Sequence, residues 1–142
     1  MIDIHSLVPK SKFDNTNIFK LDRLSDTEIE PIIYELLEWL QDYNFPIAKD
    51  ILPIILLHQN IAVPHIINVL EGNDVMWRYW IMYLVIPNLL VTNKRLLRTS
   101  LEKTAALTGD DEDTKELVEI AKHCLAFYYT TEQAFSTTAH FT

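Results

Sequence analysis

The sequence contains very little glycine and cysteine. Among its 142 residues there are 2 Gly and 1 Cys. So few glycines leave little room for the tight turns of a many-stranded β fold or for a glycine-rich phosphate-binding loop. The single cysteine, Cys124, excludes a disulfide within the chain and is typical of a reducing compartment. We therefore expect a cytoplasmic protein. Residues 1–14 agree with this, because they lack the charged region followed by a long apolar core that makes a signal peptide.

Positive charge is also scarce. Lys and Arg number 12 against 20 Asp and Glu, which gives a net charge of −8. A nucleic-acid backbone or an anionic membrane surface attracts clustered Lys and Arg, so the composition argues against both as partners. The same acidity permits a basic protein as the partner, although most acidic proteins are acidic only for solubility.

Long apolar runs are missing as well. The most apolar stretch, DVMWRYWIMYLVIP at residues 74–87, has 12 residues between Asp74 and Pro87, and one of them is Arg78. A helix that crosses a membrane needs about 20 residues, so this stretch is predicted to be a helix packed between neighbours. At helical spacing, one side carries Trp77, Trp80, Ile81 and Leu84, and the other carries Arg78, Tyr79, Met82 and Tyr83.

What the chain does have is apolar residues at helical spacing along nearly its whole length. Ser25 and Glu28 have the spacing of a capping box, which marks the start of a helix. The inner face of the helix near residue 100 is predicted to carry Leu96, Leu97 and Leu101. The pattern predicts helices over residues 15–23, 29–40, 46–55, 62–71, 75–86, 93–107 and 114–128.

These helices predict an all-α fold. Three segments, 48–52, 77–81 and 121–125, each place one cation before an apolar pair, which suggests a repeated unit. We expect a HEAT-like stack of helical hairpins, an α–α superhelix of about six or seven helices. It would form a single domain over residues 1–128, followed by a loosely held C-terminal tail over residues 129–142.

Several segments resemble a known protein family. The segments LVPKSKFD, LSDTEIEPIIYELLEWLQDYNFPIAKDI, VPHIINVL and DVMWRYWI are similar to a family of small bacterial helical proteins classed as a domain of unknown function. The resemblance covers about residues 5–125, and EIEPIIYELLEWLQDYNFP is its most specific part. It implies a HEAT-like or armadillo-like fold. It implies no catalytic residues, because the family has none established.

Two groups of residues are candidates for binding a partner. Arg78 lies beside Tyr79 and Tyr83, and an Arg among tyrosines has the composition of an interface hot spot. The alternative is that Arg78 pairs with a carboxylate while its stem covers apolar surface. The second group could equally fix a corner between two helices, and it consists of Trp39, Asp42, Asn44 and Phe45.

Catalytic and metal-binding motifs do not stand out. Glu35, Glu38 and Asp42 form a row of carboxylates at helical spacing, which can serve a small site but is more often a solvated face. Cys124 falls in an apolar stripe and is predicted to be an inert core thiol. No metal or cofactor is expected, because no pair with ligand spacing occurs among His5, His58, His65, His123 and His140.

The function that follows is non-catalytic protein binding. A more specific hypothesis is an immunity or antitoxin-like protein that neutralises a basic effector. The alternative is a small enzyme or small-ligand-binding protein, with a pocket near Arg78, Tyr79 and Tyr83 or near Glu35, Glu38 and Asp42. The oligomeric state stays open.

Overall fold

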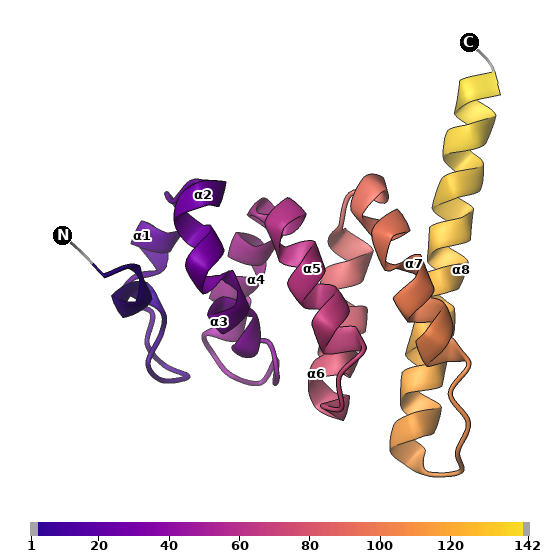
Figure 1. Ribbon diagram of the computed structural model, residues 1–142, viewed down its shortest axis with the longest axis horizontal. Coiled ribbons are helices and arrows are strands. Elements are labelled where there is room, and N and C mark those ends of the chain that lie inside the picture. Colours follow the sequence, from indigo (N-terminus) through magenta and orange to yellow (C-terminus); the bar gives the residue numbers. More distant parts are fainter. Residues whose placement is uncertain (1–2, 141–142) are drawn as a thin grey trace. The chain divides into compact units, whose positions relative to one another are not determined.

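The computed structural model describes the backbone of residues 3–140 and the side chains of residues 3–127 (Figure 1). Its described part is helical, which confirms the all-α class, and it has seven helices when α2, η2 and α3 are taken as one. The elements are η1 (Ile4–Leu7), α1 (Ile18–Leu21), α2 (Asp26–Ile29), η2 (Glu30–Ile32), α3 (Ile33–Glu38), α4 (Ala48–Leu57), α5 (Gln59–Leu70), α6 (Val75–Trp80), η3 (Ile81–Val85), η4 (Ile86–Asn88), α7 (Val91–Ala105) and α8 (Glu112–His140).

The chain divides into two compact units, residues 1–66 and residues 67–142, and the division falls inside α5. Each unit has its own buried apolar side chains. The single domain expected over residues 1–128 stays a prediction. Among the described residues no single helix has both the length and the apolar composition to cross a membrane; α4 and α5 reach both only as a pair, across a bend of 117°.

The first unit has the apolar core that the sequence predicts. Its first long helical segment starts at the expected capping box: Ser25 Oγ accepts from the Glu28 amide at 3.2 Å, and the Ser25 amide donates to Glu28 Oε1 at 3.0 Å. Each fully buried aliphatic side chain contributes about 1.5–3 kcal/mol to folding. The core of this segment and of α4 is made by Ile29, Ile32, Ile33, Leu36, Leu37, Ile51, Ile54 and Ile55.

Proline changes the first unit locally. The helix expected over residues 29–40 is interrupted by the 3-10 turn η2, whose first turn contains Pro31. Pro31 has no N–H to donate, so the segment tightens there and then resumes as α3. Pro53 lies inside α4 on the exposed side and leaves that helix continuous.

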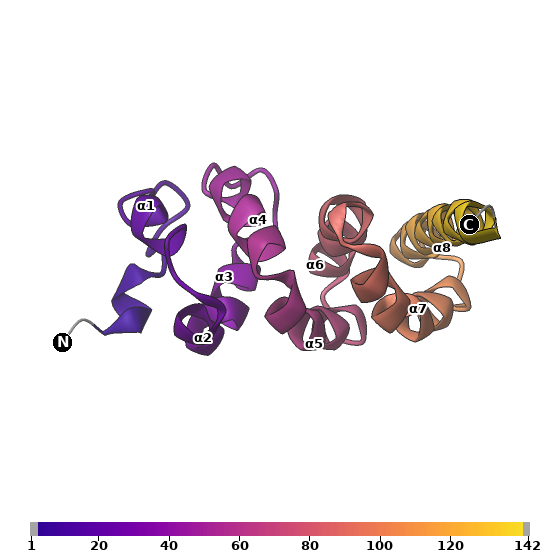
Figure 2. The same cartoon turned by 90° about the horizontal axis from the view of Figure 1, so that it is seen from above.

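The second unit contains the long antiparallel pair α7 and α8, which lie side by side in Figures 1 and 2. Leu97, Leu101, Leu117 and Cys124 are buried between elements of this unit. The prediction that Leu96 faces inward is wrong, because its side chain is 61% exposed. The buried face of α7 includes polar side chains instead. It consists of Asn93, Lys94, Leu97, Ser100, Leu101 and Thr104.

The apolar stretch at residues 74–87 is not one regular helix. Asp74 caps α6 by accepting from the Trp77 amide at 3.0 Å, but residues 81–85 form the π-helical turn η3. A π turn fits more residues into one turn and shifts the faces that follow it. Met82 and Tyr83, which helical spacing places on the same side, differ in burial: Met82 is fully buried and Tyr83 is exposed.

The last helix runs further than the periodicity indicates. The helix α8 continues to His140, past the end expected near residue 128. The expected loosely held tail, residues 129–142, lies outside the residues whose side chains are described.

Candidate functional site

The end of α6 and the π turn η3 together carry a cluster of aromatic rings in the second unit. The rings of Tyr79 and Tyr83 are stacked, with centroids 5.8 Å apart and an interplanar angle of 9°. Trp80 meets both of them edge-on, at 5.3 Å from Tyr79 and 6.0 Å from Tyr83. Aromatic side chains are rigid and bury much area, and this cluster leaves Tyr83 53% exposed. The two tyrosines predicted to act together therefore form one surface.

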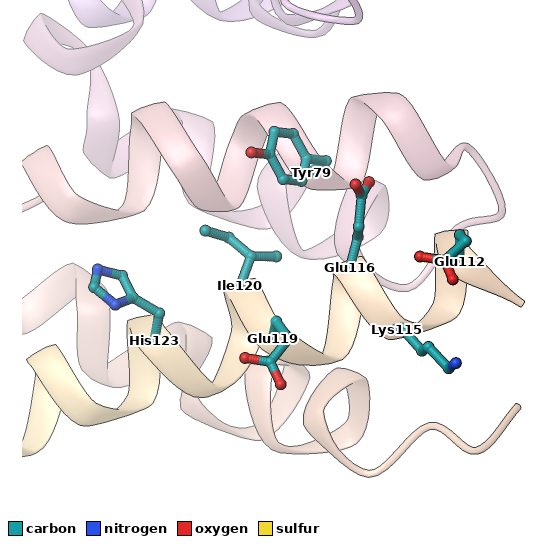
Figure 3. Close-up of a pocket in the computed structure, with 7 residues that line it drawn as sticks. All are labelled: Tyr79, Glu112, Lys115, Glu116, Glu119, Ile120 and His123. Carbon is teal, nitrogen blue, oxygen red and sulfur yellow. The ribbon is translucent and has the colours of Figure 1, made fainter. Parts of the chain in front are cut away.

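A groove of about 410 Å³ opens beside Tyr79. Figure 3 shows Tyr79 facing Glu116 and Ile120 of α8. Three glutamates line the groove, and Lys115 is the single lysine or arginine among the described residues that line it. We call this surface the acidic groove; it consists of Tyr79, Glu112, Lys115, Glu116, Glu119, Ile120 and His123.

The local sequence explains why the glutamates share one face. Asp111 fixes the start of α8, because its carboxylate accepts from the Thr114 amide at 3.0 Å and from the Thr114 hydroxyl at 2.8 Å. These hydrogen bonds lower the pKa of Asp111. Glu112, Glu116 and Glu119 then follow at spacings of four and three, which places them along one side of the helix.

Arg78 does not join the tyrosines. It lines a separate groove of about 300 Å³ with Lys103 and Thr104, and its Nη2 donates to Thr104 Oγ1 at 3.4 Å. Its Nε is buried and has no hydrogen-bond partner among the described residues. An ion pair in that groove joins Lys103 to Glu71 at 2.7 Å. Arg78 itself has no carboxylate partner among the described residues, so the alternative interpretation, in which it pairs with a carboxylate, is wrong there. Burial lowers the pKa of Arg78.

The second predicted group lies in the first unit and has structural contacts. Trp39 Nε1 donates to the Pro9 carbonyl at 3.1 Å, and its ring meets Phe45 edge-on at 5.9 Å. Asp42 accepts from the Asn44 amide at 2.8 Å and so closes the turn after α3. These contacts favour the interpretation of a fixed corner between helices.

The row of Glu35, Glu38 and Asp42 does not converge on one point. Glu35 pairs with His5 at 2.7 Å, and Asp42 is used in its turn. Glu38 is exposed. Among the described residues no group of three or more His, Cys, Asp or Glu side chains is arranged to hold a metal ion. The row therefore offers separate carboxylates rather than a shared site.

Cys124 is buried, as the apolar stripe predicts, and its thiol donates to the Met82 carbonyl at 3.2 Å. Burial raises the pKa of Cys124 to about 12. A thiol that stays protonated is a poor nucleophile.

Two further buried residues were not predicted from the sequence. They are His58, whose ring contacts Asp26, and Lys94, which lines a cavity near Cys124.

With this geometry in place, the comparison with protein families decides where the chain belongs. A family model described as Domain of unknown function (DUF5071) matches residues 7–125. The chain belongs to this family. The match confirms the resemblance to an uncharacterised family over nearly the range predicted from the sequence. No curated protein matches the sequence. Both the acidic groove up to His123 and the corner around Trp39 fall within the DUF5071 region.

Proposed function

We propose that this protein is a non-catalytic protein-binding module whose acidic groove takes a basic segment of a partner. The observation that carries the proposal is that Tyr79 faces Glu116 in a groove that Glu112 and Glu119 also line. A Lys or Arg side chain placed there gains attraction to the ring face of Tyr79 and charge-assisted hydrogen bonds to the carboxylates. The net charge of −8 steers such a partner towards the chain.

The aromatic cluster supplies the apolar part of the same interface. Tyr83 is half exposed and stacked on Tyr79, so a partner that covers the acidic groove also buries ring surface. Interface hot spots are enriched in Tyr, Trp and Arg. The alternative of a small enzyme is less well supported, because the predicted carboxylate row is dispersed and the Cys124 thiol stays protonated.

The proposal also covers the cell compartment, the helical arrangement and the kind of partner. We infer a cytoplasmic protein of bacterial type with a HEAT-like arrangement of helix pairs, a fold that offers broad surfaces for partners. The specific partner we favour is a basic effector that the chain neutralises, in the manner of an immunity or antitoxin-like protein. Acidity and an acidic groove support this version.

The experiment is a tagged pull-down from lysate of the native host, read by mass spectrometry. Wild type runs beside the double variant Tyr79→Ala, Glu116→Lys and beside the control Glu38→Lys, which makes the same charge change at an exposed position outside the groove. We expect a basic partner that wild type and the control capture and the double variant loses. Capture should weaken as salt rises, because exposed charges are screened.

Two outcomes would count against the proposal. Capture of the same partner by the double variant would move the interface away from the acidic groove. Capture of no basic protein by wild type would remove the support for a basic partner. The immunity-like version needs one more result: the purified chain must inhibit the captured effector in an activity assay, and binding without inhibition would reject it.

A further inference from the structure

Lys94 is buried on the inner face of α7. Its side chain is 5% exposed, and its position three residues before Leu97 and seven before Leu101 places it on the same side of the helix as these core leucines. Its Nζ lies 4.3 Å from the centroid of the Phe127 ring. Lysines are almost never buried to this extent without a partner of opposite charge.

No such partner is present among the described residues. The ion pairs nearest in sequence use other cations, Arg98 with Glu102 and Lys103 with Glu71. The Cys124 thiol lies close by but does not supply negative charge, because it donates to the Met82 carbonyl. Burial lowers the pKa of Lys94, which fits an ammonium that has lost water and gained little in return.

Lys94 faces a cavity of about 140 Å³. The walls are mainly apolar and come from three elements, with Ile86 of η4, Leu101 of α7 and Phe127 of α8. Besides Lys94, the polar groups at the lining are His123 and the Cys124 thiol. An apolar cavity of roughly 150 Å³ holds a molecule the size of benzene. The space is therefore that of a small ligand with one charged end.

We propose that this cavity binds a small organic acid, whose carboxylate pairs with Lys94 and whose compact apolar body fills the space between Ile86, Leu101 and Phe127. A carboxylate would supply the missing charge and accept hydrogen bonds from a group that can only donate. Inorganic anions fit the site less well, because they would leave the apolar walls unfilled. The site goes beyond the proposed protein partner and does not depend on it.

The test measures binding of benzoate and isovalerate, each against its neutral amide, by calorimetry. Wild type should bind at least one of the acids about tenfold or more tightly than its amide. The variant Lys94→Met should lose that preference. The matched control Lys103→Met makes the same change on the same helix at a position that is 65% exposed, and it should bind like wild type.

A second measurement on wild type guards against a variant that fails to fold. In a chain labelled at lysine Cε, NMR titration should show that the acid raises the pKa of Lys94 towards its ordinary value of 10.5. Failure of both acids to bind at millimolar concentration would overturn the proposal. Equal binding of acid and amide, or binding that leaves the titration of Lys94 unchanged, would overturn it as well.

Discussion

The Nδ1 atom of His58 lies 2.5 Å from a carboxylate oxygen of Asp26, although 32 residues separate the two along the chain. His58 is 3% exposed and ends α4, while Asp26 begins α2 and is 56% exposed. The contact therefore fixes the start of one helix of the first unit to the end of another. The second ring nitrogen, Nε2, is buried with no hydrogen-bond partner among the described residues.

The first prediction concerns this contact. Asp26→Ala should lower the free energy of unfolding by about 1–3 kcal/mol, because it leaves a second nitrogen of a buried ring without a partner. Chemical denaturation followed by circular dichroism measures the change. The exposed neighbour Thr27→Ala serves as control and should stay within about 0.5 kcal/mol of wild type. Equal stability of the two variants would show that the His58–Asp26 contact adds nothing.

The second prediction concerns the buried ammonium. Lys94→Met should raise the free energy of unfolding near neutral pH by about 1 kcal/mol or more, because it keeps the length of the side chain and removes a desolvated charge. Burial lowers the pKa of Lys94 in the folded state, so above that pKa the unfolded chain holds the proton more tightly and the destabilising contribution of Lys94 becomes smaller as pH rises. The advantage of the variant should therefore shrink as pH rises.

Denaturation of both proteins at several values from about pH 7 to about pH 10 measures this trend. Lys94 and Cys124 interact, because the Lys94 charge lowers the pKa of the thiol, so both proteins carry Cys124→Ala in this comparison. A constant difference across the range would mean that Lys94 is solvated in the folded chain. A destabilised variant would mean that Lys94 has a favourable partner.

The third prediction concerns Cys124. With the pKa raised to about 12 and the side chain 4% exposed, the thiol should react with a disulfide reagent at about pH 8 at least about a hundredfold more slowly than in the unfolded chain. Colorimetric labelling with and without guanidinium measures the two rates. Native labelling within about tenfold of the unfolded rate would contradict the burial of Cys124 or reveal frequent opening of the second unit.

The fourth prediction concerns the contribution of the Arg78 guanidinium to the free energy of unfolding. Among the described residues its guanidinium makes one long hydrogen bond, to Thr104, and its buried Nε has no partner. Arg78→Met keeps the apolar stem, so the free energy of unfolding should stay equal or rise by up to about 1 kcal/mol. Arg78→Ala removes the stem as well and should be less stable than Arg78→Met. A clear loss of stability in Arg78→Met would show that the guanidinium itself holds the fold.

Local patterns predict much of this fold correctly. The capping box at Ser25 and Glu28 and the apolar series from Ile29 to Leu37 depend on neighbours within two turns, so spacing alone identifies them. The tyrosine pair is similar, because Tyr79 and Tyr83 are one turn apart and stack on each other. Pro31 shows the limit of this approach: the apolar series runs through it and does not indicate the 3-10 turn that it forms.

The candidate site was harder to predict because its partners come from distant segments. Nothing near Tyr79 in sequence indicates Glu116, since the two meet only when α6 and α8 pack in the second unit. The face of α7 illustrates the same point. Leu96 and Lys94 are two residues apart, and the sequence favours the leucine as the buried one, yet packing exposes Leu96 and buries Lys94.

The sequence by itself determined the helical class, the capping of α2 and α6, the acidity and the apolar faces of the first unit, because each depends on composition or on contacts within a few residues. The tertiary structure alone decided the π turn, the acidic groove, the buried contact of His58 and the cavity of Lys94. These features arise where helices remote in sequence pack together, and there burial is set by the shape of the neighbouring helix rather than by the polarity of the residue.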